Sequence, residues 1–156
     1  MRLNLLAAYD EQLRTDAETT HALAVSSMGP IRLAVFPGGR GFVSYANLGG
    51  ADAARAAELV DGALEHFRGI AGITSVEWKT RSHDHAPGLH DALVTRGFVP
   101  EDTESIMIGE AALPAGEVAV PDGVELRRAR TEAEVLAMAE MQGIVFEDPH
   151  WLARAE

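Results

Sequence analysis

Apolar residues recur with helical spacing at three places in the first hundred residues, namely 3–15, 52–68 and 87–96. The pattern is clearest over 52–68, where charged side chains fill the positions between the apolar ones. The apolar face of that helix consists of Ala56, Val60, Ala63, Leu64 and Phe67. Over 3–15, the matching face is formed by Leu5, Leu6, Tyr9 and Leu13.

The helix over 87–96 carries signals at both ends. Pro87 suits the first turn of a helix, where a missing N–H costs nothing. Gly97 suits the left-handed position just past the last helical residue. Phe98 is then expected to fold back onto Leu93, which is the apolar contact that accompanies such an ending.

Strand-like runs lie between these helices. Three short ones, 22–26, 31–36 and 42–47, are separated by tight-turn residues and predict an antiparallel meander. A fourth run, 74–80, alternates with period two and places Val76 and Trp78 on one face. The helix between 42–47 and 74–80 is long enough for a parallel crossover, so these two strands are expected to be parallel neighbours. The predicted fold class is α/β, with helices packed on a mixed sheet.

The last third of the chain has a different pattern of apolar and polar residues from the first two thirds. Residues 103–110 look like a final strand of the first lobe (1–112), and 113–123 contains Pro and Gly without periodicity, which indicates a linker. After it, 124–128 resembles a strand, and Thr131 and Glu134 form a capping box that opens a helix. A lone strand and helix cannot bury both apolar faces. We therefore interpret 124–156 as the opening of a second lobe, or as a segment that docks on the first lobe or on another chain.

Composition narrows the possible functions. The chain has 156 residues, no cysteine and a net charge of −11, of which −2 falls on residues 1–100 and −9 on 101–156. A chain without cysteine has no disulfide framework and no thiolate nucleophile. Its acidity disfavours nucleic acid and anionic membranes as partners. The sequence shows neither a signal peptide nor a run long enough to span a bilayer, so we expect a cytoplasmic protein.

The densest group of potential metal ligands is Ser82-His83-Asp84-His85 together with His90. It lacks the helical His-x-x-x-His spacing and has no cysteine, so we predict no metal site. Histidines in a loop between a strand and a helix are usually exposed or capping groups. The alternative interpretation is that the same loop contacts a substrate, because loops at strand ends carry function in α/β proteins. Phe67 and Trp78 are interpreted as core residues.

The order of elements resembles the GNAT superfamily of acetyl-coenzyme A-dependent N-acetyltransferases, without its first strand. The stretch 89–98, ending in Gly97-Phe98, looks like the family's late helix, and 124–134 looks like the opening of a fresh GNAT domain. The resemblance therefore implies a tandem protein, with a GNAT-like lobe in 1–112 and the start of a second lobe in 124–156.

The family's cofactor turn is written Gln/Arg-x-x-Gly-x-Gly/Ala, and its amides bind pyrophosphate at a helix start. Asn47, Gly49 and Gly50 lie in the corresponding turn and are the only residues to which the resemblance assigns weak acetyl-coenzyme A binding. Asp52 stands at the third motif position, where we expect it to cap the helix and repel pyrophosphate.

Catalytic residues are missing from the pattern as well. Leu93 occupies the position of the family's tyrosine acid, and it cannot donate a proton. Glu77 and Glu104 are possible bases, but exposed carboxylates are usually only solvated. The resemblance therefore implies a degenerate lobe without catalytic residues, whose partner is a C-terminal GNAT lobe or a second copy of the chain. Two functions stay open: a non-catalytic lobe of an N-acetyltransferase, and an interaction or dimerisation module.

Overall fold

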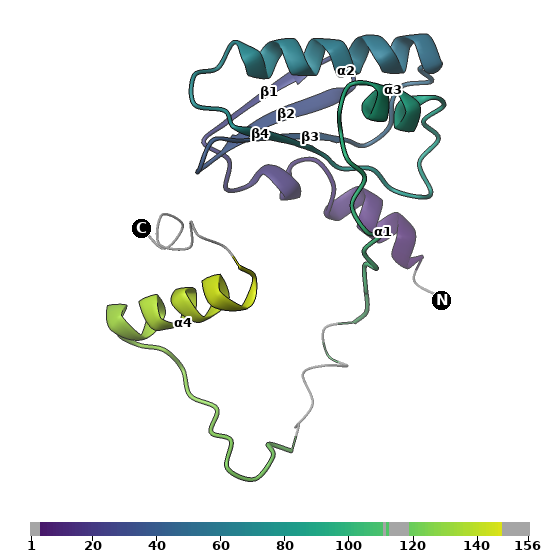
Figure 1. Cartoon of the computed structure of the whole chain (residues 1–156). Coiled ribbons are helices and arrows are strands. Elements are labelled where there is room, and N and C mark those ends of the chain that lie inside the picture. Colours follow the sequence, from purple (N-terminus) through teal and green to yellow (C-terminus); the bar gives the residue numbers. More distant parts are fainter. Residues whose placement is uncertain (1–3, 111, 113–118, 148–156) are drawn as a thin grey trace. The chain divides into compact units, whose positions relative to one another are not determined.

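The computed structural model describes residues 4–110, 112 and 119–147 (Figure 1). The chain divides into two compact units, 1–108 and 109–156. The first unit contains a four-stranded sheet with helices, and the described part of the second contains one helix. The predicted boundaries at 112, 113–123 and 124–156 stay predictions, because 111, 113–118 and 148–156 lie outside the described residues.

The sheet consists of β1 (Ala24–Met28), β2 (Ile31–Phe36), β3 (Arg40–Tyr45) and β4 (Ser75–Trp78), in the order β1-β2-β3-β4. The first three strands form an antiparallel meander, and β4 pairs with β3 in parallel. The predicted meander and the predicted parallel crossover are both confirmed. The mixed α/β class of the first unit is therefore established.

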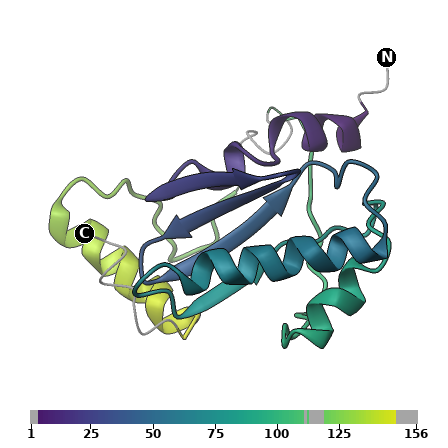
Figure 2. The same ribbon diagram turned by 90° about the horizontal axis from the view of Figure 1, so that it is seen from above.

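Helices cover both sides of this sheet. Helix α2 (Ala53–Arg68) and helix α3 (Leu89–Thr95) lie on one side, whereas α1 (Leu5–Gln12) and the short 3-10 helix η1 (Ala17–Thr19) lie on the other (Figure 1). Helix α2 runs alongside the strands that it covers (Figure 2). The first unit therefore has three layers, with the sheet in the middle.

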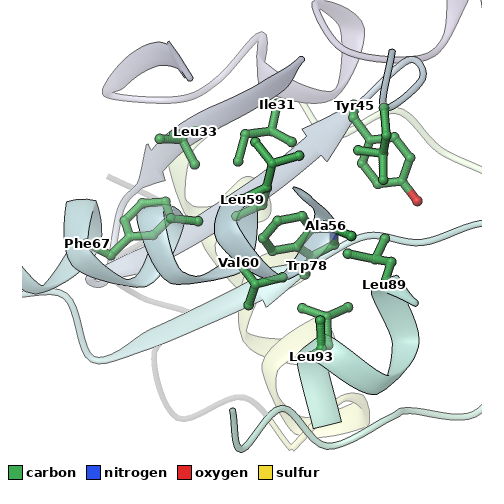
Figure 3. Close-up of a cluster of buried hydrophobic side chains, with 14 residues drawn as sticks. Ile31, Leu33, Tyr45, Ala56, Leu59, Val60, Phe67, Trp78, Leu89 and Leu93 are labelled. Carbon is green, nitrogen blue, oxygen red and sulfur yellow. The ribbon is translucent and has the colours of Figure 1, made fainter. Parts of the chain in front are cut away.

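The main core lies between the sheet and the helices α2 and α3 (Figure 3). Phe67 and Trp78 are both buried there, as the sequence predicts, and Phe98 meets the Trp78 ring edge-on at 6.4 Å between centroids. Tyr45 also belongs to this core, together with aliphatic side chains from β2, β3, α2 and α3. They include Ile31, Leu33, Val43, Leu59, Val60, Leu89 and Leu93.

Helix α3 ends where the sequence predicts but begins two residues later than predicted. Gly97 has φ 90°, its N–H donates to the Val94 carbonyl at 3.0 Å, and the Phe98 N–H donates to the Leu93 carbonyl at 3.1 Å. This pair of bonds is the Schellman motif, which confirms the predicted ending. The prediction that Pro87 occupies the first helical turn is wrong. The helix starts at Leu89 because Gly88, with φ 72°, takes the cap position.

The expectation for α1 is only partly met. The helix ends at Gln12, and Thr15 follows with φ 58° instead of continuing it. Of the four predicted face residues only Tyr9 is buried, whereas Leu5, Leu6 and Leu13 are 40 to 50% exposed. Helix α1 therefore has little apolar contact with the sheet, and polar side chains make its attachment.

Two predicted strands do not form. Residues 103–110 and 124–128 have no strand structure, and Met107 is 95% and Leu126 78% exposed. A strand-like sequence forms a strand only where a neighbouring strand supplies hydrogen bonds, and neither segment has one among the described residues. The capping box at Thr131 and Glu134 is confirmed, and it opens α4 (Glu132–Val145). Whether the apolar face of α4 docks on the first lobe or on another chain stays a prediction.

Candidate functional site

The turn between β3 and α2 has the tight backbone that its glycines predict. Asn47 accepts a hydrogen bond through Oδ1 from the Gly49 N–H at 2.9 Å, and the Ala51 N–H donates to the Leu48 carbonyl at 3.2 Å. Gly49 and Gly50 both have positive φ, at 64° and 78°. Leu48 is buried and anchors the turn to the core. The three predicted cofactor residues are thus close together, but the Asn47 side chain is used to shape the turn.

Asp52 caps α2, as the sequence predicts. Its Oδ1 accepts a hydrogen bond from the Arg55 N–H at 2.9 Å, which occupies one of the free amides at the start of the helix. The nearest cation, Arg55, is paired with Glu58 at 2.7 Å. The turn, Pro30 and Arg55 line a shallow depression of about 400 Å³. A carboxylate at the positive end of the helix makes this depression a poor site for a pyrophosphate.

Leu93 belongs to the core. Only 7% of it is exposed, and it packs with residues of α2 and β4 in the main cluster. Glu77 and Glu104 are both exposed. The structure therefore does not bring any of the three positions considered for acid or base chemistry into a shared, desolvated site.

A cluster of charged side chains lies at the carboxyl ends of the parallel strands β3 and β4. Its centre is Arg14, which is 5% exposed. The Arg14 guanidinium holds Asp84 with two bonds of 3.0 Å and donates to the Tyr45 carbonyl at 2.7 Å and to Asp10 at 2.9 Å. This arrangement connects the end of α1, the end of β3 and the loop after β4. Two-bond pairing with a carboxylate is a geometry that arginine supplies and lysine does not.

A second centre lies beside it. The buried Glu18 carboxylate of η1 accepts hydrogen bonds from Arg81, from the Ser44 hydroxyl and from the Thr15 N–H. Arg81 also donates through Nε to the Tyr9 hydroxyl at 2.9 Å. We call the residues of both centres the latch cluster: Tyr9, Asp10, Arg14, Glu18, Ser44, Arg81 and Asp84. Because α1 buries only one apolar side chain, the latch cluster supplies most of its attachment.

The pKa values of Glu18, in the cluster, and of the adjacent Tyr45 follow from this environment. Burial by itself would raise the pKa of Glu18, but the hydrogen bond from Ser44 and the positive charge of Arg81 hold it below its usual value. Burial and the nearby Asp84 charge raise the pKa of Tyr45. Glu18 is therefore ionised and Tyr45 neutral at neutral pH.

The stability of the first unit should fall in acid because of Glu18. A carboxyl whose folded pKa is depressed stabilises the fold above its unfolded pKa, and this contribution is lost as the pH falls below that value. We expect the urea midpoint of the chain to drop between pH 6 and pH 3. Glu18→Gln should lower the midpoint at pH 6 and make it less dependent on pH, whereas Glu58→Gln, in an exposed pair, should leave the pH dependence unchanged. If the urea midpoint changes equally with pH in Glu18→Gln and in the wild type, Glu18 is not the cause of the acid sensitivity.

Two residues of the loop with the predicted histidines, His83 and Asp84, contact members of the latch cluster. His83 Nε2 lies 3.0 Å from Asp10, and Asp84 is the partner of Arg14, whereas His85 and His90 are exposed. Within the described ranges no three His, Cys, Asp or Glu side chains gather where they could hold a metal ion. None of the helices in the described part combines the length and hydropathy that a bilayer crossing requires.

Sequence reasoning missed the latch cluster because its members are far apart in the chain. Arg14 and Asp84 are separated by 70 residues, and Glu18 and Arg81 by 63. No pattern in the sequence identifies these partners, because local spacing does not record contacts between distant residues. No known family model, curated protein or solved structure matches this chain.

Proposed function

We propose that residues 1–112 are a non-catalytic, GNAT-like lobe of an N-acetyltransferase. In this proposal, acetyl transfer from acetyl-coenzyme A to an amine belongs to a second lobe, of which 124–156 would be the opening. The element order of the first unit supports it, because an antiparallel meander is followed by a helical crossover to a parallel strand and by a helix ending in Gly97-Phe98. The cytoplasm remains the expected location.

The observation that carries the proposal is the cap of α2. The Asp52 carboxylate occupies the start of α2, which is where the GNAT superfamily binds pyrophosphate. Arg55 is already paired with Glu58. An anionic ligand would meet like charge at the place where it needs free amides. Leu93, at the position of that family's tyrosine acid, lies in the core and cannot protonate a departing thiolate.

Calorimetric titration of the chain with acetyl-coenzyme A tests the proposal. We expect a dissociation constant weaker than about 1 mM, which corresponds to less than ~4 kcal/mol of binding free energy. Asp52→Ser keeps a capping oxygen and removes the charge, so any residual affinity should increase in this variant. Low-micromolar binding by the wild type that is abolished by Gly50→Glu would refute the proposal, because it would show that the turn holds the cofactor.

A second function, an interaction or dimerisation module, is favoured by a different observation. The edge strand β1 has no charged side chain, and Leu23, just before it, and Val25, within it, are 71% and 48% exposed. Exposed and uncharged edge strands pair readily with other chains unless something covers them. This function does not require any binding of acetyl-coenzyme A.

A further inference from the structure

The edge of β1 is the least protected part of the sheet. Among the described residues β1 pairs only with β2, and the five pairs of that ladder run without a bulge. From Thr19 to Ile31 the sequence has no Asp, Glu, Lys or Arg, which is the longest such stretch in the chain. Charges, prolines and bulges are the usual means of protecting an edge strand, and β1 has none of them.

The hairpin turn determines which backbone groups of β1 face the free edge. Gly29 and Pro30 form a two-residue connection between β1 and β2, and Gly29 has φ 57°, as the first central position of a type II′ turn requires. The residues that flank such a turn, Met28 and Ile31, form a hydrogen-bonded pair. Because bonded and non-bonded pairs alternate, the N–H and C=O groups of Val25 and Ser27 point to the free edge.

We propose that β1 pairs antiparallel with β1 of a second copy of this chain, around a two-fold axis at Ser26. In this register Val25 of one copy faces Ser27 of the other. The N–H and C=O groups of these two residues form a pair of hydrogen bonds, and the two-fold axis repeats this pair on its other side. Ala24 of one copy faces Met28 of the other. The eight strands of the two copies form one continuous sheet.

A second copy fits this edge better than a partner of another kind. An antiparallel strand pair is self-complementary around a two-fold axis, so one uncharged strand supplies both halves of the interface. A chain with a net charge of −11 repels its own copies, and that repulsion is smallest where the longest uncharged stretch meets itself. The opposite edge strand, β4, is shorter and carries the exposed Glu77, so it is protected against the same pairing.

The inference rests on the second function, interaction, and is independent of acetyl-coenzyme A binding. The contact is small, because it involves one five-residue strand and the exposed side chains of Leu23 and Val25. Interfaces of this size are weak. The dimer is therefore expected to dissociate on dilution.

Sedimentation of the full chain tests the association. The mass should rise from 16.7 kDa towards twice that value as the concentration increases from about 5 to about 500 µM. Val25→Lys places a charge on each side of the axis and should keep the chain monomeric throughout this range. Val94→Lys, at a valine of α3 with similar exposure (44% against 48%), is the matched control and should associate like the wild type. A monomer at the highest concentration, or equal association of both variants, would overturn the proposal.

A crosslink tests the register, because the chain has no cysteine of its own. Residues opposite one another in a non-hydrogen-bonded pair have Cα atoms about 4.5 Å apart, which lies within the range of a disulfide. Ser26→Cys should therefore form a covalent dimer under mild oxidation, and Ser75→Cys, on the other edge strand, should not. Equal crosslinking of the two variants would show random collision, and concentration-independent protection of the Val25 and Ser27 amides would show that the chain's own residues cover the edge. Either result would overturn the proposal, whereas the titration with acetyl-coenzyme A would be unaffected.

Discussion

Replacing Arg14 by alanine is expected to destabilise the first unit by about 3–5 kcal/mol, which is the usual effect of removing one partner of a buried ion pair. The substitution leaves the Asp84 carboxylate, whose side chain is 7% exposed, without its two-bond partner, and it removes a donor to the Tyr45 carbonyl. Urea unfolding followed by circular dichroism measures this loss. Helix α1 should also exchange its amide hydrogens much faster, because the latch cluster makes most of its attachment.

Arg55→Ala is the matched control for this experiment. Arg55 forms an ion pair of similar length with Glu58, but both side chains are more than half exposed. Exposed pairs of this kind contribute only about 0.3–0.5 kcal/mol. A double substitution of Arg14 and Asp84 should cost less than the sum of the two single ones, because the second change removes a group that has already lost its partner. Additive losses, or an effect of Arg14→Ala no larger than that of Arg55→Ala, would show that the latch cluster does not hold the lobe.

Replacing Gly88 by alanine should cost about 2–5 kcal/mol through two separate effects. Gly88 has φ 72°, a conformation that costs an L-residue with a side chain about 1–2 kcal/mol. An added Cβ would lie 2.5 Å from the Ala53 Cβ and 2.9 Å from its Cα, so the starts of α2 and α3 would have to move apart. Overpacking of this kind costs about 1–3 kcal/mol.

Gly97→Ala separates the two effects. Gly97 also has positive φ, at 90°, but a Cβ there would meet nothing within 4 Å. Only the backbone cost should remain, and the difference in unfolding free energy between the two variants measures the crowding at Ala53. If both substitutions cost the same, the close approach of α2 and α3 at Gly88 does not matter for stability.

Acetyl-coenzyme A binding and self-association test different parts of the molecule. The first depends on the turn with Asn47, Gly49 and Gly50 and on the Asp52 cap, and the second on the free edge of β1. A chain that fails to bind the cofactor and forms the β1 dimer would favour the interaction module. A monomeric chain that fails to bind it would leave the non-catalytic lobe as the remaining proposal.

Elements whose causes are local could be predicted from the amino-acid sequence. The α2 pattern, the Asp52 cap, the Gly97 ending and the Thr131 capping box all depend on residues within a few positions of one another, and each is present in the structure. The parallel pairing of β3 and β4 was also predictable, because a crossover of that length permits little else.

Features that depend on contacts between distant segments could not be predicted in this way. Residues 103–110 contain a strand-like apolar run, Ile106 to Ile108, yet only β4 forms a strand, because pairing with β3 completes its hydrogen bonds. Leu5, Leu6 and Leu13 have helical spacing but stay exposed, since α1 is attached by Arg14 and Glu18 to groups more than twenty residues away. Spacing along the chain carries no information on such partners. The latch cluster and the free edge of β1 both depend on how the sheet brings distant segments together. Neither could therefore be predicted from the sequence.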